Sequence, residues 1–88
     1  MIQGVIMADE SKELGRIGFD GETPLVREPI IVKLSSFKNS KYLDIRKYYD
    51  KDGEWCPTSK GVTLHREQIR ELLQIITDNT NEIEQWFN

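Results

Sequence analysis

The sequence predicts a small α+β fold in which strands precede a helix, and three features support this prediction. Apolar and polar residues alternate over residues 30–35 and again over residues 41–49, as in strands that are buried on one face. Asp52-Gly53 is a strong signal for a two-residue hairpin turn that directs the chain back toward Trp55. Beyond Arg66, apolar side chains recur at helical spacing, at Ile69, Leu72, Leu73 and Ile76.

The composition suits one small domain. The chain has 88 residues, of which 38% are hydrophobic and 31% charged, as is ordinary for a soluble folded protein. No apolar stretch is long enough to span a bilayer, and the N-terminus lacks a secretory signal, so we expect no membrane association. Cys56 is the only cysteine, which excludes an intrachain disulfide. A chain of this size without disulfides or a metal often completes its core by dimerising.

The remaining elements are predicted in chain order. Residues 1–29 form an N-terminal extension that is partly irregular or contains an added strand, with a turn at Asp20-Gly21. Residues 36–40 connect the first two strands of the domain proper, which spans residues 30–88. Residues 57–61 are predicted to form a loop that leads to a short strand at residues 62–64.

The helix is predicted to begin near His65 or Arg66 and to carry a wide apolar stripe. Asn79-Thr80-Asn81 is weakly helical, so we expect a kink or break there. Such a wide stripe has two interpretations. It could form a contact between subunits, or its aromatic end at Trp86 and Phe87 could pack on the chain's own sheet. The stripe residues assigned to a dimer interface are Leu72, Ile75, Ile76, Ile83 and Trp86.

Charge is unevenly distributed along the chain, although the net charge is only −3. Residues 33–66 contain eight basic and four acidic side chains, whereas the segments before and after them are acidic. Such a basic region indicates either an anionic partner or an ordinary solvated sheet face.

The residues exclude the common catalytic and metal-binding chemistries. His65 and Cys56 are the only histidine and the only cysteine, too few for a four-ligand zinc site. Neither belongs to a recognisable nucleophile motif, and the segment that begins at Asp50 fails the calcium-loop template. We therefore expect no enzyme activity, no catalytic residue, no metal and no cofactor.

The informative constellation is a set of cations interleaved with aromatic residues on the predicted sheet. Cations follow the phosphates of a single strand, while aromatic rings stack on unpaired bases with little sequence preference. The helix is acidic and apolar, so the sheet is the better candidate surface. The cations include Lys33, Lys38, Lys41, Arg46 and Lys60, and the aromatic residues are Phe37, Tyr42, Tyr48, Tyr49 and Trp55.

The order of several short motifs resembles the Positive Cofactor Four family of transcriptional coactivators. The similarity covers about residues 30–78. It is carried by the run from Phe37 to Tyr49 with its central Leu-Asp-Ile-Arg, by the Asp-Gly-Glu turn that ends at Glu54 with the following Pro57, and by Lys-Gly-Val-Thr-Leu ending at Leu64. The resemblance implies a curved four-stranded antiparallel sheet followed by a C-terminal helix, in a homodimer whose helices form part of the interface.

The resemblance also implies the function and its residues. Family members bind single-stranded or melted DNA along the sheet with little sequence specificity. Phe37 and Tyr49 are expected to stack on bases, and Lys38, Arg46 and Lys60 to contact phosphates or bases. Asp44 and Gly61 are expected to be structural, with Asp44 pairing with a neighbouring cation. Together with a groove shifted toward Lys33, Lys41 and Trp55, these assignments give the predicted DNA-binding set.

Three departures from the family pattern favour weaker binding or a shifted groove. Ser40 replaces the second lysine of the turn after Phe37, basic residues are missing near Glu28 and Ile30, and the hairpin after Tyr49 is shorter. Two alternatives therefore stay open, a protein-interaction module on the same fold and an RNA-binding protein. Transcription or replication proteins are further expected partners. Since the serine- and lysine-rich tail of eukaryotic relatives is absent, we expect a cytoplasmic, nucleoid-associated protein of bacterial or viral source.

Overall fold

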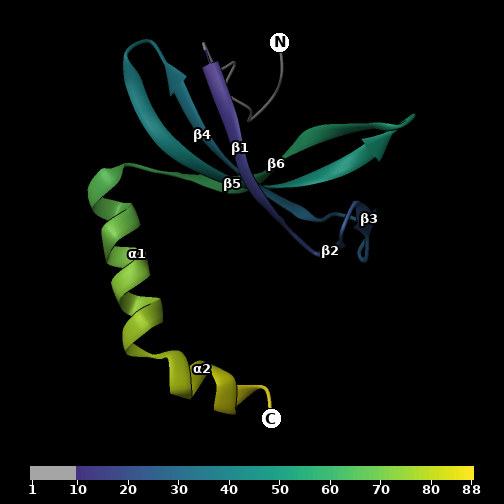
Figure 1. The fold of residues 1–88 in the computed structure, drawn as a ribbon. Coiled ribbons are helices and arrows are strands. Elements are labelled where there is room, and N and C mark those ends of the chain that lie inside the picture. The colour runs from purple at the N-terminus through teal and green to yellow at the C-terminus, as the bar shows by residue number, and fades with distance from the viewer. Residues whose placement is uncertain (1–9) are drawn as a thin grey trace.

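A computed structural model describes residues 10–88, and residues 1–9 of the predicted extension lie outside the described residues. Its main sheet is antiparallel, with the strand order β1-β4-β5-β6. These strands are β1 (Glu10–Ile17), β4 (Ile30–Phe37), β5 (Ser40–Lys51) and β6 (Glu54–Leu64). Figure 1 shows that this sheet is strongly curved and that the helices follow it. The predicted α+β fold, with four antiparallel strands before C-terminal helices, is confirmed.

The N-terminal extension supplies one edge of the sheet. β1 pairs with β4 and contains a bulge between Glu13 and Gly15, so Leu14 has no partner across the ladder. The two-stranded ribbon formed by β2 (Phe19–Asp20) and β3 (Thr23–Pro24) follows β1. Its turn includes Gly21, which has a positive φ of 63°, so the predicted turn at Asp20-Gly21 is confirmed.

Two tight hairpins join the long strands. The turn between β5 and β6 is Asp52-Gly53, as predicted, and both residues have positive φ values of 54° and 89°. This conformation matches the right-handed twist of the flanking strands. The turn between β4 and β5 is only Lys38-Asn39, also at positive φ. The predicted connection over residues 36–40 is therefore too long, because Phe37 still pairs with Ser40.

The predicted loop over residues 57–61 belongs instead to the single long strand β6. The register shifts beside Lys47, where β6 contains extra residues between Pro57 and Gly61. The bulge is held by a hydrogen bond of 2.8 Å from Thr58 Oγ1 to the backbone oxygen of Lys47. Because these polar groups are satisfied within the sheet, the strand continues through a segment whose sequence is typical of a loop.

The pleat of the sheet separates two faces with different chemistry. Paired residues across antiparallel strands point to the same face. The register places Lys33 opposite Asp44 and Trp55 opposite Asp50, on the face that also contains Arg46 and Tyr48, here called the polar face. The other face, here called the apolar face, includes Ile30, Val32, Leu34, Leu43, Ile45, Val62 and Leu64, with Lys41, Lys47 and Tyr49 toward its ends.

Burial within one chain is greatest on the polar face. Ile31, Tyr42, Tyr48 and Arg46 are buried there, with at most 9% of their surface exposed. By contrast, Leu34 and Val62 on the apolar face remain 43% and 53% exposed. A single chain therefore leaves much of its apolar face uncovered.

The helical segment begins and breaks where the sequence predicts. α1 (Arg66–Asp78) starts after His65, whose backbone N–H donates to Gln68 Oε1 at 2.9 Å. α2 (Thr80–Trp86) follows a break at Asn79. The side chain of Asn79 donates to the oxygen of Ile75 at 2.8 Å, which competes with continuation of the helix.

Gly61 allows two strands to approach closely. A Cβ at this position would lie 2.7 Å from the backbone oxygen of Ile45 and 2.9 Å from the Cα of Arg46. These backbone atoms cannot rotate away, so the predicted structural role of Gly61 is confirmed.

We expect Gly61→Ala to lower the free energy of unfolding by roughly 1–3 kcal/mol, because the added methyl group forces the strands apart. Urea denaturation followed by circular dichroism measures this loss. Gly15→Ala is the matched control, since a Cβ there meets nothing within 4 Å. Equal losses at the two positions would contradict the steric explanation.

Candidate nucleic-acid interface

The structure divides the predicted DNA-binding residues between the two faces. Lys33, Phe37, Arg46 and Trp55 lie on the polar face. Lys38 lies in the adjoining turn and Lys60 in the bulge of β6. Lys41 and Tyr49 have the opposite strand parity and belong to the other side of the sheet. The structure therefore brings most of the predicted set, but not all of it, onto one surface.

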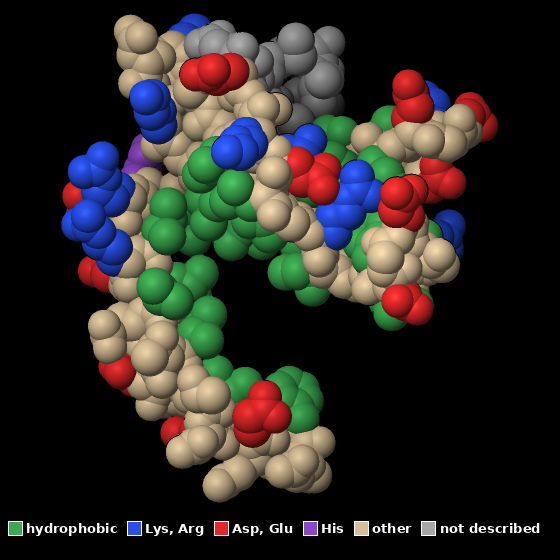
Figure 2. All heavy atoms as spheres, in the orientation of Figure 1, with side chains coloured by type: hydrophobic (Ala, Val, Ile, Leu, Met, Phe, Trp, Pro, Cys, Tyr) green, Lys and Arg blue, Asp and Glu red, His purple; other side chains and the backbone are tan. Residues whose placement is uncertain are grey.

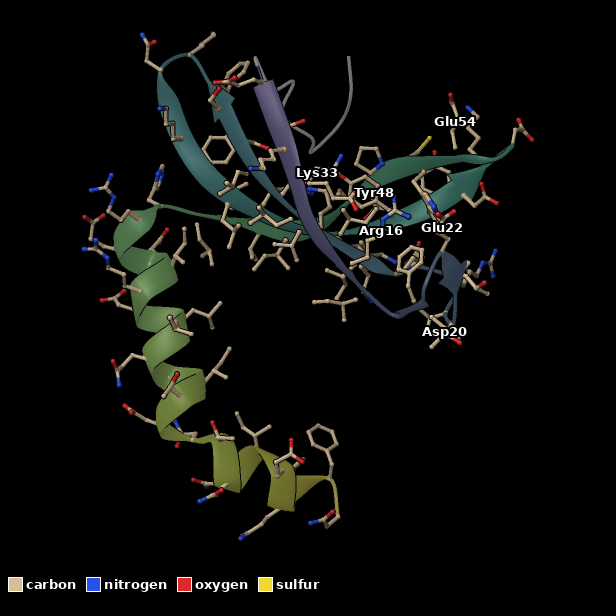
Figure 3. The ribbon with its side chains drawn as sticks, viewed as in Figure 1. Arg16, Asp20, Glu22, Lys33, Tyr48 and Glu54 are labelled. Atoms are coloured by element: carbon tan, nitrogen blue, oxygen red, sulfur yellow. The ribbon has the colours of Figure 1, made fainter. Side chains whose placement is uncertain are left out.

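Two cations on this surface lie directly over aromatic rings. Lys33 Nζ is 4.9 Å from the centre of the Tyr48 ring, and Lys38 Nζ is 5.3 Å from that of Phe37. Figure 3 shows Lys33 and Tyr48 close together beside β1. The Lys38–Phe37 pair presents a positive charge beside a half-buried ring, the combination that binds phosphates and unpaired bases. The Tyr48 ring is only 5% exposed, so the pair at Lys33 offers its cation rather than its ring.

A second aromatic cluster includes two residues that the sequence analysis did not select. Phe19 and Trp55 pack edge to face, with ring centres 5.5 Å apart, and Arg16 lies 5.0 Å above the Phe19 ring. Arg16 also pairs across the sheet with Ile31 of the polar face. The bulge in β1 interrupts the alternation of apolar and polar residues along this strand. The only sequence signal for a strand here was therefore the polar residue Arg16 next to the apolar residue Ile17.

Arg46 is buried rather than presented to a ligand. Its side chain is 7% exposed and that of Asp44 13%, with 3.0 Å between Arg46 Nη2 and Asp44 Oδ1. Arg46 Nη1 also donates to the backbone oxygen of Thr58 at 2.9 Å, which ties the bulge of β6 to β5. The prediction that Asp44 pairs with a neighbouring cation is confirmed. Arg46 thus supports the polar face from within.

Two exposed cations beside the polar face also have carboxylate partners. Lys60 Nζ lies 3.2 Å from Glu28 Oε1, and Arg16 Nε lies 2.7 Å from Glu13 Oε2. The hydrogen bond from Arg16 holds the pKa of the Glu13 carboxyl below its usual range and raises the pKa of Arg16. This pair therefore forms at neutral pH and is lost as the pH falls through the lowered pKa of Glu13.

The residues predicted for a dimer interface are all exposed in the single chain. The exposed fractions are 37% for Leu72, 60% for Ile75, 47% for Ile76, 39% for Ile83 and 83% for Trp86. In Figure 2, hydrophobic side chains line the hollow between α1 and the sheet. The apolar stripe of α1 and the apolar face thus border one open concavity.

Clusters of metal ligands and membrane-spanning helices are both absent from the described part of the chain. Over residues 10–88, the side chains form no cluster of three or more potential metal ligands. Among the described helices, none is long and apolar enough to cross a bilayer.

Comparison with known families matches residues 28–75 to the family described as Transcriptional Coactivator p15 (PC4). This match includes the whole of β4, β5 and β6, and most of α1. More than half of the chain is covered, so the chain belongs to the PC4 family of transcriptional coactivators, as its motifs predicted.

Curated relatives have names that agree with this family. An RNA polymerase II transcriptional coactivator of Drosophila melanogaster is 38% identical over 53 residues, which are 60% of this chain and 48% of that protein. The coactivator KELP of Arabidopsis thaliana is 49% identical over 37 residues, 42% of this chain and 22% of that protein. A putative coactivator of Neurospora crassa is 38% identical over 45 residues, 51% of this chain and 26% of that protein.

The matched regions span about half or less of these relatives' lengths. No solved structure matches the chain significantly. The expected cytoplasmic, nucleoid-associated location in a bacterium or virus is wrong, because these relatives are eukaryotic RNA polymerase II coactivators.

We expect Arg46→Ala to lower the free energy of unfolding by about 3–5 kcal/mol, because it leaves Asp44 largely buried without its cation. Lys60→Ala removes an exposed ion pair and should cost less than about 1 kcal/mol. Urea denaturation compares the two variants. Adding Asp44→Asn to Arg46→Ala should restore part of the loss, because it removes the unpaired charge. Equal effects of Arg46→Ala and Lys60→Ala would contradict the assigned role.

Proposed function

We propose that the chain forms a homodimer that binds single-stranded or melted DNA with little sequence specificity and acts in transcription. The observation that carries this proposal is the pairing of cations with aromatic rings along the polar face, at Lys33 with Tyr48 and Lys38 with Phe37. Membership of the PC4 coactivator family and the relatives' names support the role in transcription.

The polar face fits a single strand better than a duplex. A duplex reader usually inserts a helix with basic and amide side chains into the major groove. Residues 71–88, which include most of α1 and all of α2, contain four acidic and no basic side chains. Phosphates would instead meet the cations of the sheet, and unpaired bases its rings.

We assign the path of the strand to residues that share one surface of the sheet. We propose contacts from Lys33, Phe37, Lys38, Trp55 and Lys60, which lie on the polar face, its turn and its bulge. Arg46 acts as a positioning residue through Asp44 and Thr58. Lys41 and Tyr49 point to the other side of the sheet and have no place in this path.

Dimerisation is supported by how little of the chain is buried. No residue of α1 or α2 is buried, and the buried hydrophobic core of the described chain is Ile31, Tyr42 and Tyr48. A continuous apolar surface of this kind is typical of an interface rather than of a monomer's exterior. A second copy would cover the apolar face and the stripe of α1 together.

The alternative is a protein-interaction module that has kept the fold. It is favoured by the carboxylate partners of Arg46, Lys60 and Arg16, because these carboxylates compete with phosphates for the cations. RNA binding through the same face is the other alternative, since stacking and phosphate contacts discriminate poorly between RNA and single-stranded DNA.

We expect submicromolar binding of a 20-nucleotide oligo-dT at low salt, measured by fluorescence anisotropy. For single strands, the slope of log K against log salt should be about −0.7 per phosphate neutralised. Competition with duplex DNA and with oligo-U separates the proposed ligand from the alternatives. No binding at low salt would favour the interaction module.

Substitutions on the polar face separate stacking from charge. Phe37→Ala should weaken binding by about 1–3 kcal/mol through lost stacking, and Lys33→Ala should reduce the salt slope by about 0.7. Lys47→Ala is the matched control, because Lys47 is exposed on the opposite face. A control that weakens binding as much as Lys33→Ala would place the site elsewhere.

We expect Ile75→Glu to weaken the dimer without unfolding the subunit, because this side chain is exposed within one chain but would lie in the interface. Sedimentation velocity over a concentration series measures the change, and circular dichroism monitors the fold. Glu71→Gln, which also changes the charge by one unit at an exposed site of the same helix, is the control. A monomeric parent protein at high micromolar concentration would contradict the proposed homodimer.

A further inference from the structure

We propose that β1 and the β2–β3 ribbon add a nucleotide subsite to the polar face. In this subsite a phosphate group replaces the carboxylate of Glu13 between Arg16 and Lys33, and the neighbouring base stacks at the pair formed by Phe19 and Trp55. The inference rests on the proposed binding of single-stranded DNA and deepens it. It assigns part of the nucleic-acid path to segments that precede the region matched by the family.

A bulge places the two charged side chains of β1 on the same face. In a regular strand, residues three positions apart point to opposite faces. The bulge between Glu13 and Gly15 adds one residue, so Glu13 and Arg16 both point to the polar face. Their partners across the ladder are Lys33 and Ile31, which belong to that face. One carboxylate and two cations therefore share the edge of the polar face.

The carboxylate of Glu13 is held in the way that a phosphate would be held. Arg16 Nε donates to Glu13 Oε2 at 2.7 Å, and Arg16 Nη2 donates to Glu13 Oε1 at 3.3 Å. This two-pronged geometry is the one with which arginine binds carboxylates and phosphates alike. The hydrogen bond from Arg16, with the added charge of Lys33, holds the pKa of the Glu13 carboxyl below its usual range. The position between the two cations therefore favours an anion.

This ion pair is open to replacement, unlike the buried one in the same sheet. The side chains of Arg16 and Glu13 are 33% and 38% exposed, whereas those of Arg46 and Asp44 are 7% and 13% exposed. An exposed pair contributes little to stability, because water solvates both charges once they separate. A phosphate group can thus take the place of the Glu13 carboxylate, which then turns into solvent.

The aromatic pair next to this position offers a site for a base. Phe19 of β2 and Trp55 of β6 pack edge to face, and both residues are half-buried, so part of each remains in contact with water. The guanidinium group of Arg16 lies 5.0 Å from the centre of the Phe19 ring. One arginine therefore joins the phosphate position to the aromatic pair. Planar groups of this kind stack on unpaired bases with little sequence preference.

The subsite continues the surface already assigned to the nucleic acid. Arg16 pairs with Ile31 near the start of β4, whereas Phe37 ends that strand, about 20 Å away along extended backbone. Lys33 lies between these two positions, over the ring of Tyr48. Figure 3 shows Arg16, Lys33 and Tyr48 close together beside β1. Cations thus follow the polar face from the turn after Phe37 to the β2–β3 ribbon.

Glu13→Gln tests the phosphate position through a gain in affinity, which a misfolded variant would not show. We expect this variant to bind a 20-nucleotide oligo-dT about threefold to tenfold more tightly in fluorescence anisotropy at low salt, because Glu13 no longer competes for the cations. Arg16→Ala should weaken binding by a similar factor. When Arg16→Ala is already present, Glu13→Gln should change the affinity by less than about twofold, since the phosphate position has lost its main cation.

Two further variants test the base position and control for net charge. Phe19→Leu keeps an apolar side chain against Trp55 but removes the ring, and should weaken binding about fivefold or more. Glu10→Gln is the matched control, because it changes the charge equally on the same strand but on the opposite face, where Glu10 pairs with Ser36. This control should leave the affinity within about twofold of the parent. Circular dichroism monitors the fold of every variant.

The outcomes separate this inference from the proposed function. If the parent binds oligo-dT but Glu13→Gln and Glu10→Gln have equal effects, only net charge matters and the subsite is wrong. A gain from Glu13→Gln that persists in full without Arg16 also overturns the phosphate position. Unchanged binding by Phe19→Leu overturns the base position. In each of these cases the proposed function stands. A parent protein that does not bind oligo-dT overturns both proposals.

Discussion

The alternation of side chains across one curved sheet gives its two surfaces different chemistry, and most other features depend on this separation. Register fixes Lys33, Asp44, Arg46 and Tyr48 on the polar face, while Val32, Ile45 and Val62 lie on the other. A shift of one residue in pairing would exchange the two sets. The hairpin turns at positive φ and the pairing of β1 hold the register, so they also keep the polar and apolar faces separate.

The polar face depends on a buried interaction more than on exposed charge. Arg46 joins β5 to the bulge of β6 through the oxygen of Thr58, and Asp44 balances its charge. The rings and cations above it are then held on a sheet whose strands approach closely at Gly61. Acidic residues at the margin, Glu13 and Glu28, pair with exposed cations. Such exposed pairs are weak, so a polyanion could replace them at little cost.

Unlike the polar face, the apolar face is largely exposed to water in the single chain. α1 leaves the sheet instead of lying flat against it, so the hollow in Figure 2 is lined by hydrophobic side chains of both elements. The aromatic residues at the end of the chain, Trp86 and Phe87, are exposed as well. The single chain thus leaves apolar side chains exposed both on the sheet and on the helices. A partner that brings them together buries apolar surface that water otherwise contacts.

Local signals in the sequence predicted the parts of the fold that depend on local chemistry. The Asp52-Gly53 turn, the start of α1 after His65 and the break at Asn79 each follow from residue type and spacing, and the structure confirms them. The bulged part of β6 was predicted as a loop, because its hydrogen bonds come from the neighbouring strand. The burial of Arg46 and the cluster of Arg16, Phe19 and Trp55 were also missed, since they arise from contacts between distant segments.

The central claim is that the polar face binds a single strand while α2 belongs to the contact between subunits. The chain contains two tryptophans, Trp55 on the polar face and Trp86 in α2. Titration of the 15N-labelled protein with oligo-dT, followed by the two indole N–H signals in NMR spectra, reports on both surfaces in one sample. We predict that the Trp55 signal shifts to saturation while that of Trp86 stays in place. A shift of the Trp86 signal with Trp55 unchanged would contradict the assignment of the two surfaces.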